Sequence, residues 1–315
     1  MLRFVGNSAL LNSRQIIKKK TKKKVPVWKY PNQIEREYLT NLFLLINQWK
    51  NRMVDYIFPY IDDFVQESSF QRPPESNKVK IDSDRLDDWS DKLDNLIKAY
   101  SFQISLEETK AVQELNFTGR EISNFNIKQW FKVSNSVLGI PLLQNEPYLE
   151  STINSFVKEN ISLIKNLKDT TVQQIDTTIN RGIKQGLRHE TIKKKLLKGT
   201  DLEKGVFKKV SSRAALIARD QVSKLNGQLT QLRQTGVGIS LYTWVDVNDE
   251  RVRKKHANMD GRLCKWSDAS VFSLDGGTTW LSRSSIGGVE LHPGQDYQCR
   301  CYAEPNFETL DLNLK

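Results

Sequence analysis

Residues 213–247 read RAALIARDQVSKLNGQLTQLRQTGVGISLYTWVDV, and within this stretch a helical pattern gives way to a strand pattern. Apolar side chains recur in steps of four and three at Ala214, Ala218, Val222, Leu225, Leu229 and Leu232. That spacing predicts an amphipathic helix, begun by a cap at Ser211 or Ser212 and closed by Gly236 in the C′ position. The following ISLYTWVDV alternates and is rich in β-branched and aromatic residues, which predicts a strand.

The chain beyond this strand has the composition of a small sheet with polar connections. NDERVRKKHANMDG, residues 248–261, predicts a polar connection. RLCKW (262–266), TTWLSR (278–283) and the segment around residues 297–302 are candidate short strands, separated by DGG and IGG turns. The sequence therefore predicts a short-stranded sheet after residue 238.

The chain before residue 211 is dominated by helical periodicity. The first stripe consists of Ile34, Tyr38, Leu42, Leu45, Trp49, Met53, Tyr56 and Tyr60, and predicts one long helix bent at Pro59. A second helix is expected from Asp91 to Leu106, and shorter helices broken by Gly139 and Pro141 over 107–149. A third stripe runs from Ile153 to Leu187, with a step of five after Leu167 that predicts a kink or a change of face. A short basic helix and a turn are expected after it.

These patterns predict a mainly α protein with a small C-terminal α+β domain, made of long amphipathic helices and a short-stranded sheet. We expect a basic arm at 1–30, a helical scaffold at 31–210 and the α+β domain at 211–315. No apolar run approaches the roughly 18 residues of a membrane span, and the first 14 residues lack a secretory pattern. The odd count of three cysteines argues against a disulfide framework and for a reducing compartment.

The net charge of +11 is unevenly distributed. Residues 1–30 hold nine Lys or Arg and no acidic residue, centred on Lys18, Lys19, Lys20, Lys22, Lys23 and Lys24. Such a block is suited to a polyanion or an acidic protein face, or it is simply a solubilising tail. Residues 55–115 are acidic (14 against 7) and residues 181–225 are basic (13 against 4), so we expect these two stretches to pair in the fold.

The cysteines and two of the three histidines gather within residues 256–301. On a strand, Cys299 and Cys301 would point to the same face, and with His256 and His292 they could form a Cys₂His₂ zinc site, with Cys264 as a further candidate. The alternative is two buried thiols on one face of a small sheet, with His256 hydrogen-bonded to a neighbour. A disulfide between Cys299 and Cys301 would close a very tight ring, and we do not expect it.

The polar connection at residues 248–261 also contains residues that could form a catalytic site. His256 would act as a general base beside Asp249, Glu250 or Asp260, while Arg251 and Arg253 hold a phosphate, as in a nuclease. These residues crowd one polar loop, where charged groups are usually solvated or locally paired. For that reason we expect no enzyme activity from this loop, and since the chain has no Walker A loop, dinucleotide fingerprint, Gly-x-Ser-x-Gly or His-Glu-x-x-His motif, we expect no ordinary cofactor chemistry either.

Several of these segments together carry a family pattern. They are ARDQ (218–221), the aromatic strand with Trp244, DERVRKKH (249–256), MDG (259–261) and HPGQDYQCRCYAEP (292–305). With the N-terminal WKYPNQIEREYLTNL (28–42), they resemble the phage Mu F-like, or phage head morphogenesis, family of minor head proteins in tailed bacteriophages. The resemblance covers roughly 130 residues. Asp220-Gln221 departs from the family's Thr-Glu, and residues 294–297 lengthen the segment after His292-Pro293.

The resemblance implies a protein without a catalytic reaction, placed in the virion's capsid interior and, during assembly, in the host cytoplasm. Its implied partners are the portal protein, capsid or scaffolding protein, and double-stranded DNA bound without sequence preference, with Lys18–Lys24 as the DNA contact. The stripe from Ile34 to Tyr60 becomes a candidate docking face. A structural role, with or without zinc, is implied for Arg219, Trp244, Asp249, Arg251, His256, Gly261, Cys299 and Cys301. The alternative function is a metal-dependent nuclease or toxin-like domain carried on an injected phage protein.

Overall fold

A computed structural model describes residues 25–70, 88–142, 145–199 and 204–310 of the chain, and these form two compact units. The sheet unit consists of residues 25–35, 118–156 and 219–310, and the helical unit of residues 36–117 and 157–218. Each unit thus combines stretches that are far apart in the sequence, rather than the continuous segments 31–210 and 211–315. Most of the expected arm, including Lys18–Lys24, lies outside the described residues, but Trp28 near its end is buried.

Long helices provide most of the described chain, as the periodicity predicted. They are α2 (Asn32–Tyr56), α3 (Phe58–Phe70), α4 (Asp88–Ser105), α5 (Glu108–Leu138), α6 (Leu149–Lys184), α7 (His189–Leu197) and α8 (Val206–Gly236). The predicted bend at Pro59 is confirmed as a break, because α2 ends at Tyr56 and α3 begins at Phe58. None of the helices described is long and apolar enough to cross a bilayer.

Two expectations about the helices were wrong, and buried polar residues explain both. Residues 108–138 form one helix instead of several, because Thr118, Asn126 and Ser134 occupy buried positions between the apolar ones and hide the periodicity. α6 runs unbroken past Leu167 and keeps the same buried face, because buried Thr171 fills the missing position. The hydroxyl of Thr171 donates a hydrogen bond to the carbonyl of Leu167 at 2.7 Å, which allows its burial.

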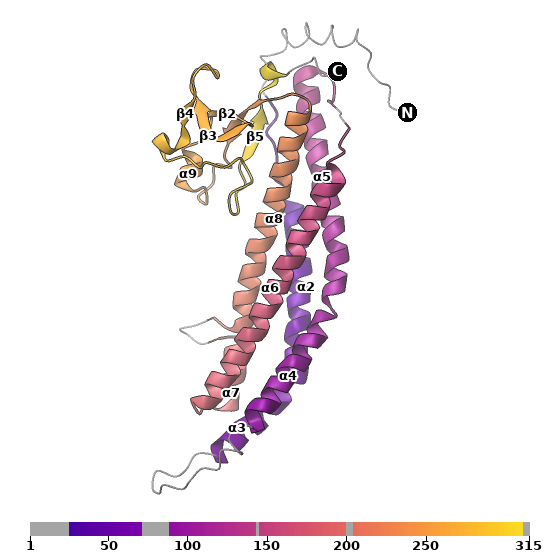
Figure 1. Ribbon diagram of the computed structural model, residues 1–315, viewed down its shortest axis with the longest axis vertical. Coiled ribbons are helices and arrows are strands. Elements are labelled where there is room, and N and C mark those ends of the chain that lie inside the picture. The colour runs from indigo at the N-terminus through magenta and orange to yellow at the C-terminus, as the bar shows by residue number, and fades with distance from the viewer. Residues whose placement is uncertain (1–24, 71–87, 143–144, 200–203, 311–315) are drawn as a thin grey trace. The chain divides into compact units, whose positions relative to one another are not determined.

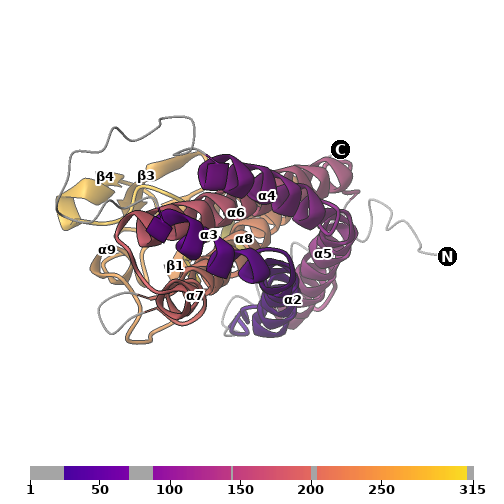
Figure 2. The ribbon, with the colours of Figure 1, turned by 90° about the horizontal axis from the view of Figure 1, so that it is seen from below.

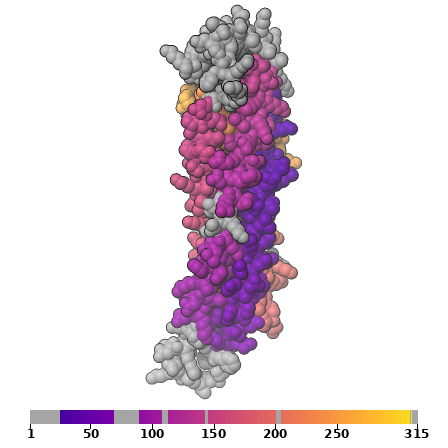
Figure 3. Space-filling model, turned by 90° about the vertical axis from the view of Figure 1, so that its right-hand side faces the viewer, coloured from indigo at the N-terminus to yellow at the C-terminus, as the bar shows by residue number. Residues whose placement is uncertain are grey.

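The helical unit uses the first stripe for its own core. Tyr38, Leu42, Leu45, Trp49 and Met53 are all buried there. The Tyr38 hydroxyl donates to the side-chain oxygen of Asn160 on α6 at 2.6 Å, and the Tyr100 hydroxyl on α4 donates to the carbonyl of Trp49 at 2.9 Å. Figure 3 shows α2 and α4 side by side on one face of this unit, and Figure 2 shows α3 beside α7. The middle of the stripe is therefore not a free docking face, which corrects that expectation.

The sheet unit contains five antiparallel strands in the order β4-β3-β2-β1-β5 (Figure 1). They are β1 (Leu241–Val245), β2 (Leu263–Lys265), β3 (Asp268–Ser273), β4 (Leu281–Ser282) and β5 (Tyr302–Pro305), with the short helix α9 (Lys254–Ala257) between β1 and β2. The predicted strand at ISLYTWVDV is β1, and RLCKW contains β2, whereas β3 was not anticipated. The small C-terminal sheet that the sequence predicts is confirmed.

Gln234 near the end of α8 connects this helix to the sheet. Its side-chain amide donates to the carbonyl of Ala303 on β5 at 2.9 Å, and its oxygen accepts from the Trp266 indole at 3.1 Å. Tyr242, Trp244, Cys264, Trp266 and Phe272 form part of the core beneath the sheet. That core includes Cys299 and Cys301.

Candidate functional site

His256 lies in α9, the short helix of the connection between β1 and β2, and is almost fully buried at 2% exposure. The indole of Trp244 on β1 packs edge-on to its ring, with the centroids 5.8 Å apart. The connection returns to the sheet at Gly261, whose amide donates to the Trp244 carbonyl at 2.8 Å and whose φ of +70° favours glycine. His256 is therefore held against the sheet core rather than exposed in a polar loop.

The two cysteines of the Cys-Arg-Cys segment meet His256 there. Nδ1 of His256 lies 3.4 Å from Sγ of Cys299 and 3.5 Å from Sγ of Cys301. All three ligand atoms lie within 4.8 Å of one another, and all three residues are buried. The cysteines are not on a strand as expected: they precede β5, which begins at Tyr302, and both thiols nevertheless point to the imidazole.

Asp296 occupies the opposite edge of the imidazole. One oxygen of its carboxylate lies 2.8 Å from Nε2 of His256, 2.7 Å from Nζ of Lys255 and 3.1 Å from the guanidinium of Arg253. Although burial opposes it, the hydrogen bonds from Lys255 and His256 lower the pKa of Asp296 to about 2. An ionised carboxylate only accepts, so Nε2 carries the proton and, in a neutral imidazole, the lone pair of Nδ1 faces the two sulfurs.

The loop that carries Asp296 is fixed on α8 by a close backbone approach. A Cβ added at Gly227 would lie 2.6 Å from the carbonyl oxygen of Pro293 and 3.1 Å from Cα of Gly294. Beside it, a carboxylate oxygen of Asp220 accepts from the amide of Gln298 at 2.9 Å. The two departures from the family pattern, Asp220-Gln221 and the added residues 294–297, therefore meet at this loop.

The pKa values of the two thiols in the cluster are shifted in opposite directions. Although burial opposes it, a hydrogen bond from the Cys301 thiol lowers the pKa of Cys299 well below its ordinary value. The same hydrogen bond and burial raise the pKa of Cys301. One sulfur is thus stabilised as a thiolate beside an imidazole nitrogen, which is a donor set suited to a soft metal ion.

His292 lies outside this group. Its Nδ1 is 2.9 Å from the Tyr242 hydroxyl, and that hydroxyl also accepts from the buried guanidinium of Arg283 at 3.1 Å. Burial and the nearby Arg283 charge lower the pKa of His292 to about 4. Cys264 is buried near Tyr242, and burial raises the pKa of its thiol. The structure thus unites three of the four predicted ligands and places the fourth in a separate hydrogen-bonded cluster.

The remaining predicted residues have local partners. Asp249 forms a salt bridge with Arg300, and one of its oxygens accepts from the amide of Arg251 at 3.1 Å. Arg219 on α8 pairs with Glu35 at 3.3 Å. The carboxylate that contacts His256 is Asp296. Asp249, one of the carboxylates proposed as its catalytic partner, pairs with Arg300 instead. The sequence patterns did not predict a role for Asp296, although an acidic residue inside the lengthened segment was the available signal.

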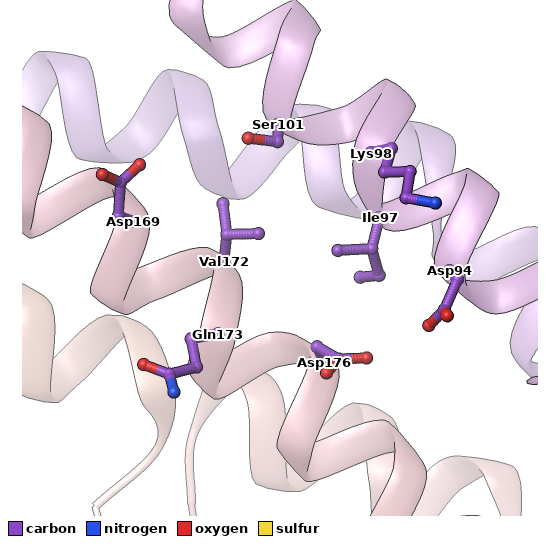
Figure 4. A pocket seen from close by; sticks show the side chains of 8 residues that line it. All are labelled: Asp94, Ile97, Lys98, Ser101, Asp169, Val172, Gln173 and Asp176. Atoms are coloured by element: carbon purple, nitrogen blue, oxygen red, sulfur yellow. The ribbon is translucent and has the colours of Figure 1, made fainter.

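The helical unit contains a separate hollow of about 400 Å³ between α4 and α6 (Figure 4). Asp94, Asp169 and Asp176 surround it with Lys98, and burial followed by the Asp94 charge raises the pKa of Asp176. Asp176 already accepts a hydrogen bond from the side-chain amide of Asn180 at 2.7 Å. We assign no ligand to this hollow, because nothing besides the carboxylates points to one.

Comparisons with known proteins agree with the pattern in the C-terminal part of the chain. Residues 173–304 match the family described as phage Mu protein F like protein, so the resemblance found in the sequence is confirmed over this range. An uncharacterized protein of Haemophilus influenzae is 31% identical over 173 residues, which are 55% of this chain and 33% of that protein. The chain therefore spans about a third of the length of that curated relative. No solved structure matches.

Proposed function

From the match of residues 173–304 to the phage Mu protein F like family, we propose that this chain is a minor head protein that acts in phage head morphogenesis. One observation supports the proposal most strongly. The matched range includes His256, Cys299 and Cys301, and the structure packs these residues into one buried cluster that fixes the connection after β1 against the segment before β5. The motif thus serves the architecture of the sheet unit, as expected for a structural protein.

The partners we propose are the portal protein, capsid or scaffolding protein, and packaged double-stranded DNA, during assembly and within the capsid. Lys18–Lys24 are the proposed DNA contact, because clustered lysines bind phosphates through counterion release. For a protein partner, the helical unit offers exposed apolar side chains, among them Phe102, Leu106 and Phe117 at 65%, 59% and 60% exposure. Large apolar side chains in contact with water favour a protein interface.

We also propose that the cluster holds a structural zinc ion. Zinc bonds of about 2.0–2.3 Å place tetrahedral ligand atoms roughly 3.3–3.8 Å apart, and the two Sγ–Nδ1 distances are 3.4 and 3.5 Å. Asp296 on Nε2 supplies the carboxylate that commonly orients a metal-binding histidine. The described residues provide three ligands, and a closed structural site has four. When bound, the ion would crosslink α9 to the segment before β5.

The proposed function is tested in a phage that encodes this chain. Purified heads are probed for the protein with an antibody, and the gene is deleted in parallel. We expect the protein in heads at low copy and defective heads without it. Normal heads after deletion, with no protein in wild-type heads, would refute the proposal. DNA cleavage by the purified protein that disappears in His256→Ala, while the variant stays folded, would favour the nuclease alternative instead.

A further inference from the structure

A strongly basic surface lies on α7 and its two flanking turns, in the helical unit. Residues 181–213 contain eleven Lys or Arg against three acidic residues. Nine of the cations are exposed, and five of these lie between the residue before α7 and Lys208 in the first turn of α8. We call them the α7 basic patch: Arg188, Lys194, Lys198, Lys204 and Lys208.

The backbone brings these residues together. Lys198, the residue that caps the end of α7, follows Lys194 by four residues, a spacing at which helical side chains share one face. Gly199 pairs with Lys204 in an isolated antiparallel bridge, so Lys204 lies beside the end of α7. Gly205 makes this approach possible, because a Cβ added there would lie 2.6 Å from the amide nitrogen of Gly199. Lys208 follows in the first turn of α8, where its amide donates to the Gly205 carbonyl at 3.1 Å.

The described acidic residues of the 55–115 stretch do not pair with this patch, although the sequence predicted that the two stretches would pair. Asp62 on α3 pairs with Lys193 at 3.0 Å and lies 3.6 Å from the ring of His189. Within the described part of the chain, none of the five patch residues forms a salt bridge. Like charges one helical turn apart repel each other. The fold therefore keeps a concentration of positive charge that its own described carboxylates leave unpaired.

The start of α8 adds to the same charge. This helix runs for 31 residues and has no acidic residue in its first turn. The amides at a helix N-terminus carry partial positive charge, which favours an anion nearby. Lys204 and Lys208 flank this end, so the backbone and the side chains act with the same sign.

Phosphate is the chemistry that fits this surface. A bilayer-binding helix exposes an apolar face beside its lysines, but the apolar residues Ile192 and Leu196 of α7 are buried. Lysines act as flexible point charges on phosphates, without reading base sequence. We propose that the α7 basic patch binds the phosphate backbone of double-stranded DNA without sequence preference. This inference rests on the proposed function, in which DNA is a partner, and adds a contact separate from Lys18–Lys24.

The test compares two full-length variants in which four lysines become glutamine. The patch variant changes Lys194, Lys198, Lys204 and Lys208. The matched control changes the exposed Lys128, Lys132, Lys158 and Lys165 on α5 and α6. Binding to a fluorescent DNA duplex is measured between about 50 and 200 mM salt, because each phosphate contact contributes roughly 0.9 to the slope of log K against log salt. We expect the slope of the patch variant, which lacks four lysines, to fall by roughly 3.6, and the slope of the control to fall far less.

Circular dichroism verifies that the patch variant is folded, and its thermal stability should be unchanged or higher because repulsion has been removed. A patch variant with the wild-type slope would overturn the inference. So would a variant that loses binding to vesicles of anionic lipid while duplex binding stays intact. The two proposals can be refuted separately. If the patch variant has a reduced slope but the protein is absent from phage heads, the assignment as a head protein is wrong. If the slope is unchanged but the protein is found in heads, only the proposal of DNA binding by the α7 basic patch is wrong.

Discussion

The contact between Gly227 and the 292–298 loop makes a quantitative prediction. Replacing Gly227 by alanine places a Cβ 2.6 Å from the Pro293 carbonyl oxygen and 3.1 Å from Cα of Gly294. Both neighbours are backbone atoms, so either α8 or the loop must move. The loop carries Asp296, so the displacement would disturb the orientation of His256 as well.

Two opposing effects set the magnitude. Alanine is about 1 kcal/mol better than glycine inside a helix, whereas overpacking against a rigid neighbour costs about 1–3 kcal/mol. We expect Gly227→Ala to lower the free energy of unfolding by about 1 kcal/mol. The control is Gly119→Ala in α5, whose Cβ would meet side-chain atoms of Ile153 at 3.1 Å and Phe156 at 3.3 Å. These side chains can shift, so the control should be neutral or stabilised by up to about 1 kcal/mol.

Urea unfolding followed by tryptophan fluorescence gives both free energies, and the rate at which the buried thiols react with a thiol reagent reports on the loop. Gly227→Ala should unfold at lower urea than Gly119→Ala and expose Cys299 and Cys301 faster. Equal midpoints and equal thiol rates would show that the loop is not fixed by α8, and the reasoning would fail.

Three further predictions concern buried polar groups. The pKa of His292 is about 4 instead of 6.5, so the unfolded chain takes up the proton first, and stability falls as pH drops from 6.5 to 4. The pH-dependent loss of stability due to His292 is at most about 3 kcal/mol. It should be absent in His292→Asn, and urea midpoints measured between pH 6.5 and 4 check this. Glu146→Gln leaves Arg233, 1% exposed, without its carboxylate and should cost about 3 kcal/mol in thermal unfolding. Tyr38→Phe removes the 2.6 Å bond to Asn160 and should cost about 1–2 kcal/mol by urea titration.

The sequence predicted most of the architecture because apolar periodicity reports directly on buried faces. The steps of four and three predicted most of the long helices, Pro59 predicted the break between the first two, and the alternation of ISLYTWVDV predicted β1. The same signal failed where polar residues are buried. Asn126 of α5 is fully buried, and its side-chain amide donates to the carbonyl of Asn226 at 3.0 Å, a long-range partner that no local pattern reveals.

The candidate site was predictable in composition and less so in geometry. Clustering of His256 with Cys299 and Cys301 followed from their residue types in one small domain, and the structure unites them. His292 was predicted as a ligand for the same reason, but in the structure its Nδ1 lies beside the Tyr242 hydroxyl instead. Asp296 was missed, because its role depends on a loop whose position is set by backbone contact with α8. Contacts of this kind leave no periodic trace in the sequence.

The proposed structural role of the cluster requires His256, Cys299 and Cys301 to act as one metal-binding unit, and elemental analysis of the purified protein tests this most directly. Protein prepared without chelators should contain about one zinc per chain. The double variant Cys299→Ser/Cys301→Ser should contain none, and Cys264→Ser should keep the metal. Wild-type protein without stoichiometric metal, or a Cys264→Ser variant that loses as much as the double variant, would contradict the account.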